Sequence, residues 1–215
     1  MSLILDLIFP KICYGCGKTG DYLCSKCQKH LIILNTKAPK NGFDGGLSLF
    51  KYQSSIKSAI TDLKYNFVSD NSTILADLMA KILKSNFPNL VKYWHQNNFI
   101  LVPIPLHQSR QNWRGFNQSE ILAEKLSQKL NLNFSNQIIV RHQNNSVQAR
   151  LKNIKDRSIN VANIFSLHQK SGNLKYKNFI LFDDVSTTNS TLLSAQKTLK
   201  TLSPSQCWYL TLSVG

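Results

Sequence analysis

The stretch FILFDDVSTTNSTL, residues 179–192, places four apolar residues before two adjacent aspartates and then a run of hydroxyl residues. The apolar run predicts a buried strand over Phe179–Phe182. Apolar residues then recur at helical spacing up to Leu202, which predicts a helix directly after the hydroxyl loop. A strand that leads through a short loop into a helix is a unit of a parallel α/β sheet. We therefore expect Asp183 and Asp184 at the carboxyl end of a strand, where such sheets bind ligands.

The rest of the chain repeats this alternation, within 215 residues of which 42% are hydrophobic. Further strands are predicted over 47–52, 99–102, 138–140 and 208–212, the last carrying Cys207 as a buried thiol beside it. Helices are predicted over 56–63, 74–83 and 119–130, the last with Ser119 as its cap. The expected fold class is α/β, a mainly parallel sheet flanked by helices. The expected domains are a segment with its linker, 1–45, and a body, 46–215.

The composition favours anionic partners, because 26 Lys and Arg against 11 Asp and Glu give a formal charge of +15. Such a charge suits nucleic acid or phosphate groups, although it is also compatible with a merely soluble surface. No apolar run approaches the ~20 residues of a membrane-spanning helix. The opening MSLILDLIFP reads as a short docking helix rather than a signal peptide, so a cytoplasmic location is expected.

Two CxxC pairs near the start, Cys13 with Cys16 and Cys24 with Cys27, are separated by seven residues. This spacing is typical of a four-thiolate zinc site, which is structural because no coordination position stays open. Disulfides are the alternative, and the missing export signal argues against them.

The loop after the two aspartates has the chemistry of a phosphate site. Its residues are Val185, Ser186, Thr187, Thr188, Asn189, Ser190 and Thr191. Hydroxyls and backbone N–H groups at a helix N-terminus favour a phosphate, whereas Asp183 and Asp184 suit a neighbouring sugar diol or Mg²⁺. An ordinary helix cap made of Asp, Ser and Thr residues is the competing interpretation.

A second motif, VPIPLHQSRQNWRGFNQ over 102–118, offers donors for anions in His107, Arg110 and Arg114. Arginine can hold two phosphate oxygens at once, although an exposed basic helix would give the same pattern. Two aromatic residues among cations, Trp94 and Trp113, are candidates to stack bases, or else belong to the core.

Together these motifs resemble the ComF family of competence proteins, which is similar to type I phosphoribosyltransferases. The resemblance covers nearly the whole chain: the paired CxxC, LKY at 63–65, VPIPLH, RGFNQ, Gln148 with Leu151, Arg157 with Asn160 and Val161, and the acidic-pair loop. The acidic-pair loop resembles the phosphoribosyl pyrophosphate motif of type I phosphoribosyltransferases, but Asn189 stands where those enzymes usually have Gly. Asn tolerates a positive φ better than other non-glycine residues, so the turn is expected to survive.

The resemblance implies a phosphoribosyl pyrophosphate (PRPP) pocket, with Mg²⁺, in which Asp183 and Asp184 are the candidate catalytic residues and residues 183–191 bind the ribose 5-phosphate. The pyrophosphate side would be formed by Lys64, Pro103, Ile104, Pro105, Leu106, His107, Arg110 and Arg114. Lys64 and the polar stretch 141–157 would close over the ligand. Candidates for contact with DNA are Arg110, Trp113, Arg114, Arg141, Arg150, Lys152 and Arg157.

Three functions follow from the resemblance and the motifs. The first is a natural-transformation protein that binds single-stranded DNA and helps it through an inner-membrane channel, working with a competence helicase at the inner face of the membrane. The second is an active phosphoribosyltransferase with an unknown acceptor. The third is a zinc-dependent module that docks a partner protein.

Overall fold

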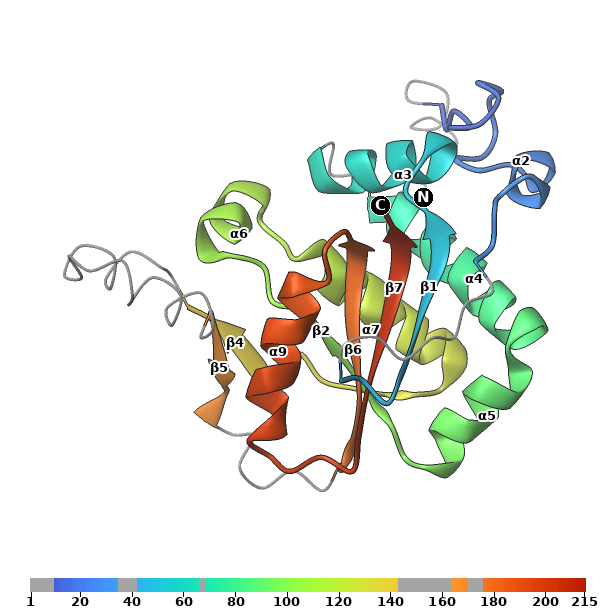
Figure 1. Cartoon of the computed structure of the whole chain (residues 1–215). Helices are drawn as coiled ribbons and strands as arrows, with labels where there is room; N and C mark the ends of the chain where they lie inside the picture. The colour runs from blue at the N-terminus through green and yellow to red at the C-terminus, as the bar shows by residue number, and fades with distance from the viewer. Residues whose placement is uncertain (1–9, 35–41, 66–68, 143–163, 170–175) are drawn as a thin grey trace.

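The computed structural model describes residues 10–34, 42–65, 69–142, 164–169 and 176–215 (Figure 1). The expected N-terminal helix, most of the expected linker and most of the polar stretch 141–157 lie outside these residues. No helix in the described part of the chain is long and apolar enough to cross a membrane.

A five-stranded parallel sheet forms the centre of the molecule, with the strand order β1-β7-β6-β2-β3. Its strands are β1 (Gly45–Lys51), β2 (Ile100–Pro103), β3 (Asn133–Phe134), β6 (Asn178–Ser186) and β7 (Gln206–Val214). A separate antiparallel pair joins β4 (Ile139–Arg141) to β5 (Phe165–Leu167). The expected fold class, a mainly parallel sheet flanked by helices with a four-cysteine cluster near the N-terminus, is therefore confirmed.

Helices cover both faces of the sheet (Figure 1). They are α2 (Ser25–Lys29), α3 (Ser54–Tyr65), α4 (Ser69–Asn86), α5 (Pro88–Gln96), α6 (Gln108–Arg114), α7 (Gln118–Leu130) and α9 (Ser190–Lys200). One core lies between the sheet and α3, α4, α5 and α7, where Ile180 and Phe182 of β6 point. The other lies beneath α9, where Phe179 and Leu181 point. This division follows from the strand geometry, because successive side chains in a strand face opposite sides.

The central strand β6 is longer than its apolar run predicts. It pairs with β7 through Ser186, so Asp183 and Asp184 lie inside the strand instead of after its end. Cys207 of β7 is a buried strand thiol as expected, and its burial raises its pKa to about 12.

The expected cap of α7 is wrong. Asn117, not Ser119, caps α7 by accepting a hydrogen bond from the Ser119 N–H. Of the two interpretations of Trp94, the core is confirmed, because the residue is fully buried in α5 and packed against Trp208. The helix α5, which contains Trp94, had no counterpart among the predicted elements. It begins at Pro88, only two residues after the end of α4, so the sequence shows no separate loop between the two helices.

Candidate functional site

The adjacent aspartates of β6 are placed in different surroundings because they face opposite sides of the strand. Asp184 is only 4% exposed, whereas Asp183 is partly exposed. Asp183 lines a small cavity of about 40 Å³ together with residues 185–192 of the following loop and helix. The sequence places the two carboxylates side by side, but the structure turns only Asp183 toward the loop.

The buried Asp184 forms an ion pair with a residue far away in the sequence. Its Oδ2 lies 2.8 Å from the Nζ of Lys64, near the end of α3. The side chains are 5% and 18% exposed, so this pair is largely shielded from water. A ligand that used Asp184 would therefore have to displace Lys64 or bind beside it. Lys64, which the resemblance implies on the pyrophosphate side, therefore lies next to Asp184.

Asp183 is held by a hydroxyl from the start of α7. Ser119 Oγ donates to Asp183 Oδ1 at 2.9 Å, and the Asp184 N–H donates to the same oxygen. Burial and the neighbouring Asp184 carboxylate raise the pKa of Asp183 to about 7, against the opposing effects of these two hydrogen bonds and of Lys64. A carboxyl with such a pKa can accept or donate a proton near neutral pH.

The hydroxyl loop forms the tight turn that the sequence predicts before α9. Asn189 adopts a left-handed conformation with φ 58° and ψ 4°. The turn therefore forms with asparagine at the position where type I phosphoribosyltransferases usually have glycine. Its side-chain oxygen accepts a hydrogen bond from Ser186 Oγ, and Thr188 Oγ1 lies 2.9 Å from Ser190 Oγ. Hydroxyls therefore gather at the N-terminus of an 11-residue helix, an arrangement suited to an anion.

The turn after β2 lies next to this loop in the sheet. The Ile104 N–H donates to the carbonyl of Phe182 at 2.8 Å, and the Asn117 side chain donates to the Ile104 carbonyl at 3.0 Å. These two bonds fix the Pro103–His107 turn beside the end of β6. His107 then caps α6 by accepting a hydrogen bond from the Ser109 N–H.

The arginines of this region have different surroundings. Arg110 is exposed on α6, whereas Arg114 is buried and donates to Gln118 Oε1 at 3.1 Å. Arg141 of β4 lines a 210 Å³ cavity that also includes Pro103 and Pro105. Burial and the positive charge of Arg110 lower the pKa of Arg141, while Asp183 opposes this shift. Arg141 therefore lies beside the turn expected to take pyrophosphate, while Arg150, Lys152 and Arg157 lie outside the described residues.

The four cysteines form a compact cluster. The Sγ atoms of Cys13, Cys16, Cys24 and Cys27 lie within 4.8 Å of one another, and all four thiols are free. Cys16 and Cys24 are 3.8 Å apart, close to the roughly 3.8 Å that a tetrahedron with Zn–S bonds of about 2.3 Å requires. The cluster can hold a metal ion, and its donor set suits zinc.

The turn between Cys13 and Cys16 is shaped for this cluster. A Cβ at Gly15 would lie 2.6 Å from Cys27 Sγ, so any other residue would push the thiolate away. Burial works to raise the pKa of Cys13, but backbone N–H groups of Cys24, Gly15 and Cys16 lower it to about 6. The backbone thus favours a thiolate at this position.

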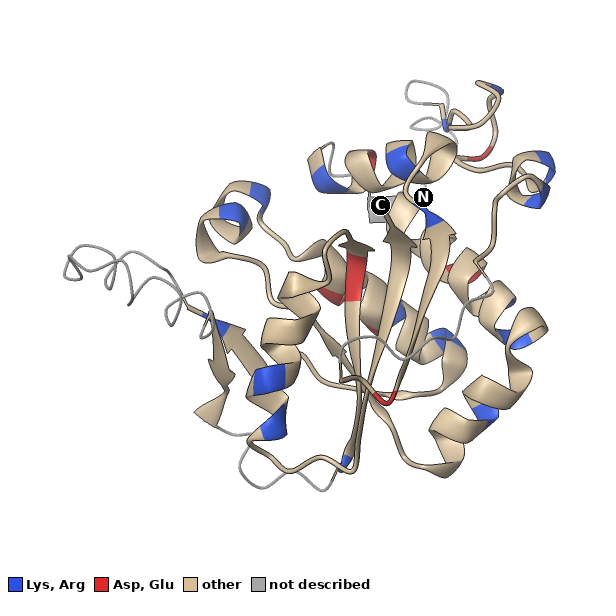
Figure 2. Cartoon of the chain, viewed as in Figure 1, with Lys and Arg blue, Asp and Glu red and all other residues tan. Residues whose placement is uncertain are grey.

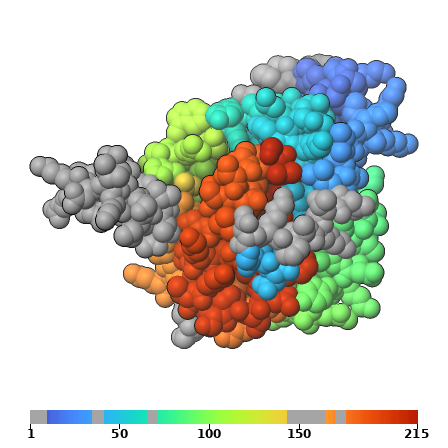
Figure 3. All heavy atoms as spheres, in the orientation of Figure 1, coloured from blue at the N-terminus to red at the C-terminus, as the bar shows by residue number. Residues whose placement is uncertain are grey.

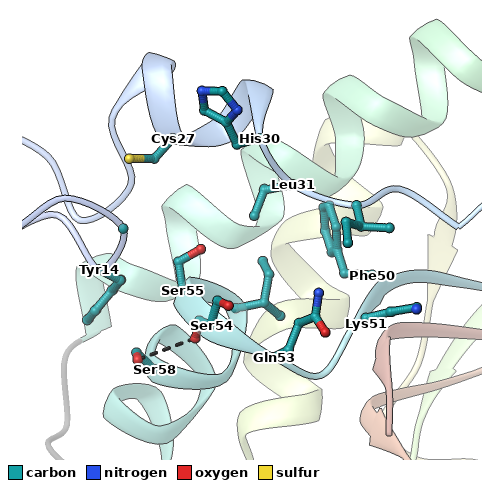
Figure 4. Close-up of a pocket in the computed structure, with 13 residues that line it drawn as sticks. Tyr14, Cys27, His30, Leu31, Phe50, Lys51, Gln53, Ser54, Ser55 and Ser58 are labelled. Atoms are coloured by element: carbon teal, nitrogen blue, oxygen red, sulfur yellow. Dashed lines mark hydrogen bonds between the residues drawn. The ribbon is translucent and has the colours of Figure 1, made fainter.

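A cavity of about 450 Å³ lies between the cysteine segment and the start of α3 (Figure 4). His30 and Leu31 line it from one side, and Gln53, Ser54 and Ser55 line it from the other. None of the acidic-pair or loop residues contributes to it, so it is not the expected phosphate site.

Sequence reasoning missed two residues near the candidate site. Ser119 was interpreted as a helix cap, although its hydroxyl bonds Asp183. Tyr65, next to Lys64, is 49% exposed and contacts the Trp113 ring. The LKY triplet marked Tyr65 as part of a motif, but no local signal indicated its aromatic neighbour.

Fold and site together define an α/β protein with an N-terminal four-cysteine cluster and an acidic pair on the strand that precedes a hydroxyl loop. Over 102 residues the chain is 38% identical to competence protein F of Haemophilus influenzae, covering 47% of this chain and 44% of that protein. It is 28% identical over 204 residues to competence protein ComFC of Bacillus subtilis, covering 88% and 78%. The resemblance to the ComF family is therefore confirmed, and the chain is a relative of these competence proteins.

No protein-family model matches the chain. Among solved structures, a hypoxanthine phosphoribosyltransferase from Staphylococcus aureus is similar at a TM-score of 0.36 and 13% identity, over 61% of this chain and 60% of that one.

Proposed function

We propose that this chain is a competence protein that binds single-stranded DNA during natural transformation and carries a pocket for PRPP or a related phosphoribosyl ligand. The observation that carries the proposal is the strand end itself, where Asp183 lines the same cavity as the hydroxyl loop before α9. The names of the two curated relatives support the competence role. The net charge of +15 supports binding to a polyanion.

In this proposal the ligand is divided among three parts of the site. Residues 186–191 hold the 5-phosphate through N–H and hydroxyl donors, and Asp183 accepts from the ribose hydroxyls. The Pro103–His107 turn, with Arg110 and Arg141 nearby, faces the pyrophosphate. Mg²⁺, which prefers oxygen ligands and phosphates, would enter with the diphosphate and not as a resident ion. Asp184 can contact the ligand only when Lys64 moves away from its ion pair with Asp184.

Calorimetric titration with PRPP and Mg²⁺ tests the pocket. We expect saturable binding by the native chain and loss of binding in Asp183→Asn/Thr188→Ala, which removes one acceptor and one donor of the cavity. The matched control is Asp77→Asn, because Asp77 of α4 pairs with Lys129 of α7 and does not line the cavity at Asp183. Equal binding by the double variant would show that the strand end is not the ligand site.

An active phosphoribosyltransferase is the second candidate, and the raised pKa of Asp183 favours it. A carboxyl that titrates near neutrality can take a proton from an acceptor nucleophile as the ribose carbon leaves pyrophosphate. PRPP-dependent release of pyrophosphate with mixed nucleobases as acceptors would establish this activity. Binding of PRPP without release of pyrophosphate would favour ligand sensing.

The competence role includes location and partners. We propose that the protein works in the cytoplasm at the inner face of the membrane, next to the DNA channel and a competence helicase, and that the zinc-loaded cysteine segment docks one of them. Transformation frequency should fall in a Cys24→Ser strain. If the purified variant still binds PRPP while transformation is lost, the cysteine segment serves a partner and not the pocket.

A further inference from the structure

Two exposed aromatic side chains meet beside the acidic pair. Tyr65 ends α3 and Trp113 lies near the end of α6, and their ring centroids are 5.8 Å apart with an angle of 60° between the planes. Tyr65 is 49% exposed and Trp113 is 63% exposed. Aromatic side chains of this size are more often buried in the core of a protein. The ends of α3 and α6 adjoin in Figures 1 and 3, so these aromatics form one surface.

A buried arginine supports the two rings. The Arg114 guanidinium carbon lies 5.0 Å from the centroid of Tyr65 and 6.0 Å from that of Trp113. Arg114 itself is 5% exposed, and its Nε has no hydrogen-bond partner among the described residues. A desolvated cation against aromatic rings is favourable and fixes their position. The rings are therefore held in place at the surface instead of collapsing into the core.

Cationic side chains lie on both helices that carry the aromatic pair, together with one acidic residue, Asp62 of α3. Arg110, exposed on α6, precedes Trp113 by three positions and so lies on the same side of the helix. Lys57, also exposed, precedes Tyr65 by about two turns of α3. Figure 2 shows Lys and Arg positions on both helices, an acidic position on α3, which contains Asp62, and the acidic positions of the neighbouring strand. Exposed rings flanked by cations suit a polyanion with free aromatic bases.

We propose that Tyr65 and Trp113 form a stacking platform for an unpaired base of single-stranded DNA, while Arg110 and Lys57 contact the adjacent phosphates. The inference rests on the proposed DNA-binding function and deepens it by assigning the surface. Lys64 links the platform to the acidic pair, because it adjoins Tyr65 and pairs with Asp184. Duplex DNA is a poorer partner, since its bases are stacked inside the helix and cannot reach the rings.

The test measures binding of the full-length protein to a fluorescein-labelled oligothymidylate by anisotropy, over a series of salt concentrations. Trp113→Ala is expected to weaken binding about tenfold or more, and Trp113→Phe to retain most of the affinity. Tyr65→Ala should lower affinity in the same direction. Ile32→Ala is the matched control, because Ile32 is a similarly exposed apolar residue (51%) in the cysteine segment. Circular dichroism verifies that each variant is folded.

A second readout follows the indole itself. Trp113 is the exposed one of the chain's three tryptophans, so stacking should quench emission on addition of DNA, and Trp113→Phe should abolish most of the quenching. Unchanged affinity and unchanged quenching in the Trp113 variants would overturn the platform while leaving DNA binding intact. No binding by the native protein would overturn both the platform and the DNA-binding function. Equal affinity for a duplex would also contradict base stacking.

Discussion

The four-cysteine cluster and the acidic strand end are assembled over different lengths of sequence. All four thiols come from residues 13–27, and a local bridge between Ile12 and Thr19 shapes their turn. The strand end needs Asp183 and Asp184, but also Ser119 and Lys64, which lie 64 and 120 positions away. The cysteine cluster is formed within one short segment of the chain. The acidic site is assembled only when the whole sheet is folded.

This difference determines how each site responds to damage. The cysteine segment contributes Leu23 to the buried core, and Tyr14, Cys27, Leu31 and Ile33 pack against that core. The rest of the segment's stability is expected to come from the metal ion. The strand end is stabilised by the sheet, whose cores lie on both sides of β6. We therefore expect the two regions to lose structure independently.

Removal of the metal should have the largest effect. Metal binding contributes on the order of 10 kcal/mol to the folding free energy of a zinc knuckle, so chelation or Cys24→Ser should unfold the cysteine segment. Zinc content, together with limited proteolysis at Lys18 and Lys26, measures the loss. Cys207→Ala is the control, because Cys207 is a buried thiol outside the cluster.

The body should keep its thermal transition after chelation if the comparison is right. Complete unfolding of the chain on metal loss would contradict the separation of the two regions. Purified protein with no bound zinc would remove the metal site altogether.

The second effect concerns the ion pair between Lys64 and Asp184. Asp184→Asn or Lys64→Met alone leaves a mostly buried charge without its partner and should cost about 1–3 kcal/mol, reduced from the value for a fully buried pair because Lys64 reaches water. The double variant should recover part of this loss. Urea unfolding of the four proteins measures the coupling, and zero coupling would show that α3 does not help to build the site.

The same distinction explains what could be predicted from the sequence. The cysteine site follows from the spacing of four residues, and the alternation of strands and helices follows from local periodicity. Asn189 was expected to tolerate a positive φ, and it adopts one. Each of these features depends on neighbours within a few residues.

The contacts between distant segments could not be predicted in this way. Ser119 has the sequence context of a cap, but Asn117 caps the helix while the Ser119 hydroxyl bonds Asp183. The strand β6 continues beyond its apolar run because β7 supplies ladder partners as far as Val214. Burial of Trp94 depends on Trp208, more than 100 residues away. Such contacts depend on tertiary packing and not on local pattern.

Asp183 should also make the stability depend on pH. Its pKa is raised in the folded protein to about 7, so between about pH 4 and that value the folded state binds more protons than the unfolded state. Stability is then lost as the pH rises through this window. Asp183→Asn should remove the loss, so its stability relative to the native chain should improve from about pH 5 to about pH 8.

Ser119→Ala provides the matched test of this assignment. The Ser119 hydroxyl favours the charged carboxylate, so its removal should raise the pKa of Asp183 further and extend the pH range over which stability falls. Urea midpoints measured across the pH range would show both changes. A native chain and Asp183→Asn with parallel pH profiles would mean that Asp183 titrates normally.

The smallest effect is expected at Asn189, where a local turn serves the nonlocal site. Its φ of 58° suits glycine, and its side chain bonds Ser186 instead of filling the loop. Asn189→Gly should therefore change stability by less than about 1 kcal/mol, whereas Asn189→Val should lose about 1–2 kcal/mol because a β-branched residue resists this conformation. Calorimetric titration of both variants with PRPP then separates turn geometry from obstruction. Unchanged affinity in the glycine variant would mean that the asparagine side chain stays clear of the phosphate, and a large gain would mean that it blocks the loop.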